Sequence, residues 1–449
     1  MEKLDLLVIG AGMAGIGAAN KCASRGWHVA IVDALPYGGT CALRGCDPKK
    51  ILRRGAEIID SARAMRGKGI DDCGLKMNWA DLMKHKRGFT DKVPASMERN
   101  LASNGVTLLH GVASFDAPSR VSIDGNQHEA RNVLVATGAR PRPLTFPGHE
   151  YVTDSTGFLE LETLPPRVMF VGGGFISFEF AHLAIRAGSS VTVIDRGERP
   201  LKEFDPDLVE LLVGHSTQLG IDLRRRTTVA KVTKVESGYR VTLDEAGTIS
   251  EVDVDLLVHG AGRVPDVASL GLERGGVEFG SRGITVSEHL QSTTNSGVWA
   301  AGDAASTRGM PLTPVAVFEG KVAATNMLAG TTTVPDYTGV PTTVFAIPEL
   351  TRVGMREEDA NASGLTVDVR YTDTGGWYSN YRLGQSVAAA KILIDRSADR
   401  IVGAHLFGAD YGELINTIAL AVKLGLSTRQ LKSAVASYPS VGSDLGSLL

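Results

Sequence analysis

A glycine-rich turn between two apolar runs is the feature that most restricts how this chain can fold. The first run, Leu4–Ile9, is short, apolar and bounded by glycine, which predicts a buried parallel strand. The turn Gly10-Ala11-Gly12-Met13-Ala14-Gly15 follows, then a helical segment to about Arg25 and a second strand, Trp27–Val32. Asp33 ends that strand, about twenty residues after the turn. This order of strand, glycine turn, helix, strand and acid predicts a dinucleotide-binding unit.

Each residue of this fingerprint has an expected role. Gly10 makes the turn, and Gly12 lets a pyrophosphate approach the backbone at the helix N-terminus. Gly15 allows the helix to pack closely on the strand. Asp33 is expected to accept hydrogen bonds from a ribose.

A second unit of the same kind begins at the strand Val168–Val171. It continues through Gly172-Gly173-Gly174-Phe175-Ile176-Ser177-Phe178-Glu179, a helix to Ala187 and the strand Ser190–Ile194, which ends in Asp195. The residues expected to bind a nucleotide here include Gly172, Gly174 and Asp195. Two units in one chain indicate one site for a flavin and one for a nicotinamide, in an α/β fold with two Rossmann-like domains.

Between the two units lies a pair of cysteines, Cys41 and Cys46, separated by four residues. The spacing is not the two-residue gap of a thioredoxin-type motif, and no further cysteine or nearby histidine completes a zinc site. In a regular helix, residues five apart have Cα atoms about 8–9 Å apart, whereas a disulfide needs about 4.4–6.8 Å. If the pair bridges, the backbone near Gly45 must therefore leave the regular helix, and the bridge is expected to be strained and redox-active. The alternative is two helix thiols that never bridge.

The stretch from Gly39 to Lys50 closely resembles the pattern GGTC-x4-C-x-PKK of the flavoprotein disulfide reductases. These are the class I pyridine nucleotide-disulfide oxidoreductases, the group with glutathione reductase, dihydrolipoamide dehydrogenase and mercuric reductase. The resemblance implies that Cys41 attacks a substrate disulfide and that Cys46 lies against FAD in a charge-transfer contact. It also places Lys49 near the reactive nitrogen of the flavin, with Glu179 as the partner of this lysine.

Further motifs occur in the order that the family has them. Ala136-Thr137-Gly138-Ala139 resembles the motif that closes the FAD domain, and Ala261-Gly262-Arg263-Val264-Pro265 resembles the motif that ends the nicotinamide domain. Gly302-Asp303 follows a strand, and Leu312-Thr313-Pro314 begins a helix that the family places near the flavin ring. In the family, the aspartate at the position of Asp303 binds the ribityl chain of the flavin. The alternative is that Asp303 serves only as a turn residue after the strand. The resemblance thus implies a cofactor site that includes Gly39, Thr40, Thr137, Gly138, Arg263, Asp303 and Thr313.

The choice between NADPH and NADH rests on conflicting residues. Ser177 replaces the third glycine, and a small non-glycine residue there favours NADPH. Arg196 and Lys202 fall where NADPH-dependent relatives grip the 2′-phosphate, although both can be ordinary solvated charges. Asp195 instead suits an unphosphorylated ribose. We favour NADPH, with NADH possible. Phe175 takes the place of an aromatic residue that gates the nicotinamide pocket, or packs in the core.

From about Pro341 the pattern changes to an antiparallel sheet with helices, which resembles the interface domain of the family. The resemblance implies a homodimer whose active site takes residues from both chains. The expected domains are an FAD-binding and central domain (1–150 and 266–337), a nicotinamide-binding domain (151–265) and a dimerisation domain (338–449).

Three departures from the family concern the reaction itself. Most relatives end in His-Pro-Thr-x-x-Glu, whose histidine serves as acid and base; here Tyr438 takes that position and Ser443 the glutamate's. Tyr438 is either a proton donor or substrate contact, or it only fills space. Met13 and Asn20 replace a serine and an arginine of glutathione reductases. Asp47, directly after Cys46, adds negative charge beside the expected thiolate, which should raise the thiol pKa unless a contact with Arg44 or Lys49 offsets it.

Composition sets the remaining limits. The chain has 449 residues and a net charge of −3, so neither nucleic acid nor an anionic membrane is an expected partner. No apolar run reaches the about 20 residues of a membrane span, and four cysteines in such a length do not form a secreted disulfide scaffold. The N-terminus shows no signal peptide, which together with the cysteine usage favours the cytoplasm.

We therefore expect an FAD-dependent NAD(P)H:disulfide oxidoreductase without a metal site. It would pass electrons through FAD and the Cys41–Cys46 pair to a small-molecule or protein disulfide. One alternative keeps the flavin but reduces a metal ion, a quinone or oxygen, since these acceptors need less proton transfer to a thiol. A third possibility is a flavin-binding sensor or scaffold dimer that turns over slowly.

Overall fold

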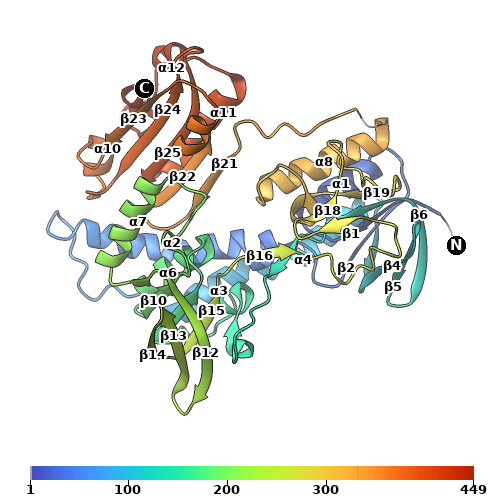
Figure 1. Ribbon diagram of the computed structural model, residues 1–449, viewed down its shortest axis with the longest axis horizontal. Coiled ribbons are helices and arrows are strands. Elements are labelled where there is room, and N and C mark those ends of the chain that lie inside the picture. The colour runs from blue at the N-terminus through green and yellow to red at the C-terminus, as the bar shows by residue number, and fades with distance from the viewer. Residues whose placement is uncertain (1–2, 331) are drawn as a thin grey trace. The chain divides into compact units, whose positions relative to one another are not determined.

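The computed structural model describes residues 3–330 and 332–449, which fall into two compact units (Figure 1). The first unit comprises the chain up to Ile51 together with Lys84–Arg142 and Arg263–Tyr337. The second comprises Leu52–Met83, Pro143–Gly262 and Thr338–Leu449. The predicted division of the second unit into a nicotinamide-binding domain and a dimerisation domain stays a prediction.

A seven-stranded sheet forms the centre of the first unit, in the order β3-β2-β1-β6-β5-β4, with β19 also paired to β6. The long strand β6 runs antiparallel to β5 through its first residues and parallel to β1 and β19 through its last ones. The strands are β1 (Leu4–Ile9), β2 (Val29–Asp33), β3 (Thr107–His110), β4 (Ala113–Ala117), β5 (Arg120–Ile123), β6 (Asn126–Val135) and β19 (Val298–Ala300).

Helices α1 (Met13–Ala23) and α8 (Thr313–Ala329) pack side by side against this sheet (Figure 1). Their approach needs a glycine, since a Cβ on Gly320 would lie 2.3 Å from the carbonyl oxygen of Ala14. The parallel strands β1 and β2 are mostly apolar because side chains on both faces of the sheet are buried there. The remaining short strands of this unit are β7 (Ala139–Pro141), β16 (Arg263–Pro265), β17 (Phe279–Gly280), β18 (Gly283–Thr285) and β20 (Ala305–Ser306).

The second unit begins its dinucleotide fold with a five-stranded parallel sheet, in the order β11-β10-β9-β15-β8. Its strands are β8 (Val152–Thr153), β9 (Arg167–Val171), β10 (Ser190–Ile194), β11 (Asp222–Arg224) and β15 (Leu256–His259). An antiparallel sheet follows β11 in the chain, formed by β12 (Thr227–Val235), β13 (Gly238–Glu245) and β14 (Thr248–Val254). The helices of this part are α5 (Ser155–Phe158), α6 (Phe175–Ala187) and α7 (Pro206–Gln218).

The C-terminal part of the second unit holds an antiparallel sheet in the order β21-β22-β25-β24-β23. Its strands are β21 (Pro341–Val344), β22 (Glu349–Gly354), β23 (Val367–Asp373), β24 (Ala389–Asp395) and β25 (Arg400–Gly408). Its helices are α9 (Glu357–Ala362), α10 (Tyr378–Tyr381), α11 (Tyr411–Leu424), α12 (Thr428–Ser433) and α13 (Leu445–Leu448).

The sequence predicted the nucleotide-binding strands well but joined two helices into one. From the sequence alone, Lys50–Met65 and Trp79–Asn104 are each expected to be mainly helical. The second of these segments is divided into α3 (Trp79–Thr90) and α4 (Val93–Ser103). Pro94 stands in the first turn of α4, where its missing N–H costs nothing, but it cannot continue a preceding helix. Helix α2 (Cys46–Ala64) also begins earlier than the expected Lys50. Among the described helices, none is both long and apolar enough to cross a membrane.

Candidate active site

The first glycine turn has the close backbone contacts that its fingerprint requires. Gly10 has a left-handed φ of +109°, and a Cβ there would lie 2.4 Å from the carbonyl oxygen of Ala136. A Cβ on Gly15 would lie 2.0 Å from the carbonyl oxygen of Gly10, so helix α1 can approach β1 only with glycine at this position. At the end of β2, the Asp33 carboxylate accepts a hydrogen bond of 2.7 Å from the N–H of Ala11.

A second glycine contact brings the cysteine motif to this turn. Gly39 has φ +65°, and a Cβ on it would lie 2.6 Å from the Cα of Gly12. The chain then forms the short π-helix η1 (Thr40–Arg44), and Gly45 follows with φ −152° and ψ −105°. The backbone thus leaves the regular helix at Gly45, as a bridging pair would need, before α2 begins at Cys46.

The two cysteines are present as thiols and interact with each other. Their side chains are hydrogen-bonded, and the Sγ atom of Cys46 lies 3.5 Å from the hydroxyl oxygen of Thr313. Thr313 was predicted as a flavin neighbour, and its contact with the thiol was not foreseen. It comes from the first residue of α8, more than 260 positions away along the chain, so no local sequence signal could have shown it.

Hydrogen bonding divides the two thiols into one that ionises easily and one that does not. The hydrogen bond from Cys41 lowers the pKa of Cys46 to about 6; burial opposes the shift, and Thr313, Lys49 and Lys50 add to it. The same bond, together with burial, raises the pKa of Cys41 well above its usual range. The pair therefore loses its first proton easily and its second with difficulty. Lys50 is a contributor that the sequence analysis did not single out.

The surroundings of Asp303 and Thr137 fit FAD. The Thr137 hydroxyl is buried and has no hydrogen-bond partner among the described residues, so it can bond a cofactor. Burial raises the pKa of Asp303, while the guanidinium of Arg263 acts to lower it. That guanidinium donates a hydrogen bond to the carbonyl of Ala139, after Gly138 at φ +71°. These groups, with the Gly10–Gly15 turn, would hold the phosphates and hydroxyl groups of FAD.

In the second glycine turn, the carboxylate of Asp195 lies close to the backbone of the glycines. A Cβ on Gly173 would lie 2.4 Å from a carboxylate oxygen of Asp195, and Asp195 Oδ1 accepts a hydrogen bond of 3.1 Å from the N–H of Gly197. Gly172 has φ +108°, and a Cβ on it would lie 2.6 Å from the Cα of Ala261. Gly174 caps α6 from an extended conformation. This arrangement fits a bound nicotinamide dinucleotide.

The residues expected to choose the nucleotide differ in placement. Ser177 is fully buried against Gly260, so it shapes the contact between helix and strand and does not face a ligand. Arg196 and Lys202 are exposed beyond the end of β10. Phe175 begins α6 with 47% of its side chain exposed, and its proposed role as a gate stays a prediction.

A basic turn beside Asp195 was missed by the sequence analysis. The N–H of Asp195 donates to the carbonyl of Arg224, and the N–H of Arg226 donates to the carbonyl of Gly197. With Arg225, these arginines line an open cavity of 820 Å³. The signal was visible as three consecutive arginines between two strands. Each arginine already has an acidic partner, namely Asp222, Glu210 and Glu198.

Lys49 and Glu179 are both buried, at 8% and 6% exposure. Lys49 lies on α2 in the first unit and Glu179 on α6 in the second, so their pairing stays a prediction. Glu179 Oε1 accepts a hydrogen bond of 3.1 Å from the N–H of Phe345.

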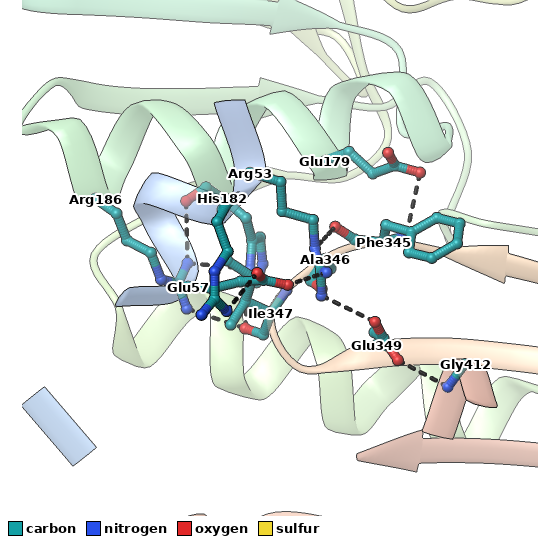
Figure 2. A network of polar contacts seen from close by, with 11 residues as sticks. Arg53, Glu57, Glu179, His182, Arg186, Phe345, Ala346, Ile347, Glu349 and Gly412 are labelled. Carbon is teal, nitrogen blue, oxygen red and sulfur yellow. Dashed lines mark hydrogen bonds and ion pairs between the residues drawn. The ribbon is translucent and has the colours of Figure 1, made fainter. Parts of the chain in front are cut away.

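Figure 2 shows the buried polar network around Phe345, Ala346 and Ile347 in the second unit. Arg53 donates to the carbonyls of Phe345 and Ala346, and Arg186 donates to that of Ile347. The loop between β21 and β22 is thereby tied to α2 and α6. Sequence periodicity could not reveal this network, since it joins segments far apart in the chain and several of its acceptors are backbone carbonyls.

Tyr438, which was predicted to take the place of the family histidine, precedes a cis peptide bond to Pro439 and is 78% exposed. Ser443, predicted to stand at the position of the family glutamate, makes its hydrogen bonds with Ser440. Its hydroxyl donates to the carbonyl of Ser440 at 2.6 Å and caps a short helical turn.

Comparison with known proteins agrees with this geometry. Residues 4–320 match the family model described as pyridine nucleotide-disulphide oxidoreductase. The chain belongs to this family. Residues 340–447 match the dimerisation domain of the same family, which indicates a homodimer.

The individual relatives are oxidoreductases. A glutathione reductase of Burkholderia cepacia is 31% identical over 99% of this chain and 98% of that enzyme. A mercuric reductase of Bacillus cereus is also 31% identical, over 98% of this chain and 70% of that enzyme. The Cu(II) complex of RclA, an HOCl-induced flavoprotein disulfide reductase of Escherichia coli, superposes with a TM-score of 0.89 at 27% identity, covering 100% of this chain and 99% of RclA.

These findings confirm the family, the α/β fold class and the enzyme class predicted from the sequence. The protein is a disulfide reductase that uses FAD and NAD(P)H. The alternative of a metal ion, quinone or oxygen as the acceptor is not favoured by them.

Proposed function

We propose that Cys41 and Cys46 are the redox pair through which this reductase passes electrons to its disulfide substrate. The observation that carries the proposal is the pairing of the two thiols, with the Cys46 sulfur 3.5 Å from the hydroxyl oxygen of Thr313. The hydrogen bond from Cys41, with Thr313, Lys49 and Lys50, lowers the pKa of Cys46. A thiol of this kind is a thiolate at neutral pH, whereas Cys41 keeps its proton.

Bound FAD supplies the electron pair that it receives from NAD(P)H. In the reduced pair, the Cys41 sulfur attacks one sulfur of the substrate disulfide, forms a mixed disulfide and releases the first thiolate. The Cys46 thiolate then attacks the Cys41 sulfur, which restores the internal disulfide and releases the second thiolate. Both leaving thiolates need a proton, and the proton lost by Cys41 on attack supplies one of them.

The second proton requires a donor at the mouth of the site. We assign this role, or a contact with the substrate, to Tyr438, reaching the site from the neighbouring subunit of the homodimer. Its exposure in the single chain and its place in the dimerisation domain support the assignment. A tyrosine hydroxyl can donate a hydrogen bond to a leaving thiolate, but at neutral pH it is a poor base for a neutral thiol.

The nucleotide is NADPH in this proposal. Arg196 and Lys202 are exposed at the end of β10, where they are available to a 2′-phosphate. Asp195 opposes this preference, so NADH is the competing outcome. The substrate in this proposal is a small-molecule or protein disulfide. The compartment is the cytoplasm, where disulfides are reduced and those of enzymes are transient and catalytic.

An anaerobic titration of the holoenzyme with NADPH, and separately with NADH, tests the proposal. Uptake of two electrons with a long-wavelength absorption band, while the flavin remains oxidised, is the expected result. Alkylation followed by peptide mass spectrometry should then find Cys41 labelled only after reduction. Bleaching of the flavin without the band, with Cys41 labelled equally before and after, would disconnect the pair from the flavin. Faster reduction by NADPH would support a role for Arg196 in binding the 2′-phosphate, whereas faster reduction by NADH would support a role for Asp195 in binding the ribose.

A further inference from the structure

Helix α8 carries a buried carboxylate that the chemistry of the cysteine pair does not use. Glu319 is 1% exposed and accepts three hydrogen bonds, each 2.7 Å long. Its Oε2 atom accepts from the N–H of Gly302, and its Oε1 atom accepts from the hydroxyls of Thr307 and Tyr337. The carboxylate thus accepts hydrogen bonds from three positions of the chain and holds them in place relative to α8.

The first of these donors belongs to the turn that presents Asp303. Gly302 has φ +68° and opens the 3-10 turn η3 (Gly302–Ala304) directly after β19. A Cβ on it would lie 3.1 Å from the Cβ of Ala316 and 3.6 Å from that of Ala14, so the turn is enclosed by α8 and α1. A left-handed glycine has wide conformational freedom, and the bond to Glu319 restricts it.

The other two donors close the space around the carboxylate. The Thr307 hydroxyl also accepts a hydrogen bond of 3.0 Å from the N–H of Gly309. The Tyr337 ring makes an edge contact with Phe318, at 6.4 Å between ring centroids. A Cβ on Gly309 would lie 2.7 Å from the Tyr337 ring and 2.8 Å from Glu319 Oε1. Burial raises the pKa of Glu319, and the three donors oppose that shift.

We propose that Glu319 is a positioning residue for FAD, which holds the Gly302–Asp303 turn so that the Asp303 carboxylate meets the hydroxyl groups of the cofactor. The proposal rests on the proposed cofactor role of Asp303 and deepens it. Fixing a ligand-binding turn in advance raises affinity because less conformational freedom is lost when the cofactor binds. Glu319 itself touches no cofactor; it acts through the backbone of Gly302.

FAD affinity of the apoprotein, measured by quenching of flavin fluorescence, tests the proposal without any turnover. Glu319→Met keeps the length of the side chain and removes all three acceptors, so we expect FAD binding about tenfold weaker or worse. Glu319→Gln retains an oxygen for the N–H of Gly302, and its amide can donate to the two hydroxyls. The FAD affinity of this variant should therefore fall less than about threefold. If the negative charge itself were required, Glu319→Gln would lose as much affinity as Glu319→Met.

Two further variants separate the possible outcomes. Asp205→Asn alters an equally buried carboxylate in the second unit, bound to Lys391 at 2.9 Å, and should lower the melting temperature without changing FAD affinity. Asp303→Asn tests the underlying assignment. Unchanged FAD binding in Asp303→Asn overturns the cofactor role of Asp303, whereas a loss there combined with unchanged binding in Glu319→Met overturns only the positioning role.

If Glu319→Met does not fold, single donors can be removed instead. Tyr337→Phe and Thr307→Val each delete one hydrogen bond to Oε1 and leave the bond to Gly302. We expect each to weaken FAD binding about twofold and the double variant to exceed either one. Wild-type affinity in the double variant would contradict the proposal.

Discussion

At the residue scale, the reactivity of the site depends on which groups surround each sulfur. Cys46 is favoured as a thiolate by donors and by positive charge, whereas Cys41 faces the developing thiolate of Cys46 and the carboxylate of Asp47. The sequence supplies both cysteines and the lysines, but Thr313 joins them only through the fold. Substitutions at Thr313 and Asp47 therefore test the two sulfurs separately.

Thr313→Val should raise the pKa of Cys46, because the thiolate loses a hydrogen-bond donor while the protonated thiol loses little. We expect a rise of about one unit, so the thiolate fraction near pH 6 falls. The measurement is the pH dependence of iodoacetamide alkylation of Cys46 in a Cys41→Ser background. Thr313→Ser, which keeps the hydroxyl, is the matched control. An unchanged profile in Thr313→Val would show that this hydroxyl does not stabilise the thiolate.

Asp47→Asn should lower the pKa of Cys41, because it removes a negative charge that disfavours the Cys41 thiolate. In a Cys46→Ser background, alkylation of Cys41 at pH 8 is expected to accelerate by about twofold. Asp47→Glu keeps the charge and serves as the control. If both variants react at the parent rate, the carboxylate of Asp47 has no influence on this sulfur.

At the scale of single elements, the two dinucleotide units are built from contacts that leave no room for a side chain. In the second unit, Ser177 replaces the glycine by which α6 would pack on the sheet, and Gly260 after β15 provides the missing space. A Cβ on Gly260 would lie 2.0 Å from the Ser177 hydroxyl oxygen and 3.2 Å from its Cβ. The serine at the position of the third glycine is thus accommodated by the glycine that follows β15.

Gly260→Ala should therefore destabilise the protein by about 1–3 kcal/mol through overpacking. Adding Ser177→Ala removes the crowded hydroxyl, so the double variant should recover part of the loss. Urea unfolding of both single variants and the double variant gives the coupling between the two positions. Strictly additive effects would mean that Ser177 and Gly260 do not constrain each other.

At the scale of the whole molecule, the C-terminal part exposes side chains that a homodimer would cover. Leu420 and Leu424 on α11 are 58% and 63% exposed, and Val435 is fully exposed. Tyr438 follows in the same segment, 78% exposed. We expect these side chains to contribute to the contact surface of the homodimer that the matched dimerisation domain indicates.

Mixed dimers test whether Tyr438 serves the site of the neighbouring subunit. A dimer of one Cys41→Ser chain with one Tyr438→Ala chain contains one intact site if the tyrosine acts across the interface, and none if it acts within its own chain. We expect such mixed dimers to regain up to half of the wild-type disulfide reduction per dimer, whereas each homodimer is impaired. Full activity of the Tyr438→Ala homodimer would show instead that Tyr438 only fills space.

The sequence alone determined the parts that depend on neighbours along the chain. Strands β1 and β10 have the predicted ends because apolar runs bounded by glycine specify buried parallel strands locally. The family and its cofactors followed from motifs such as Gly39–Lys50, since each motif is a continuous stretch with a fixed backbone task. The departure of the backbone from a regular helix at Gly45 could be inferred because a disulfide cannot span residues five apart in such a helix.

Only the tertiary structure decided the contacts between residues far apart in the chain. The hydroxyl of Thr313 at the Cys46 sulfur, the carboxylate of Glu319 at the Gly302 turn and the fit of Ser177 against Gly260 each join separate segments. Such contacts leave no periodic pattern and no motif in the sequence, because they form only when elements distant in the chain pack together. They set the pKa values and the shape of the site, whereas the motifs set only its chemical type.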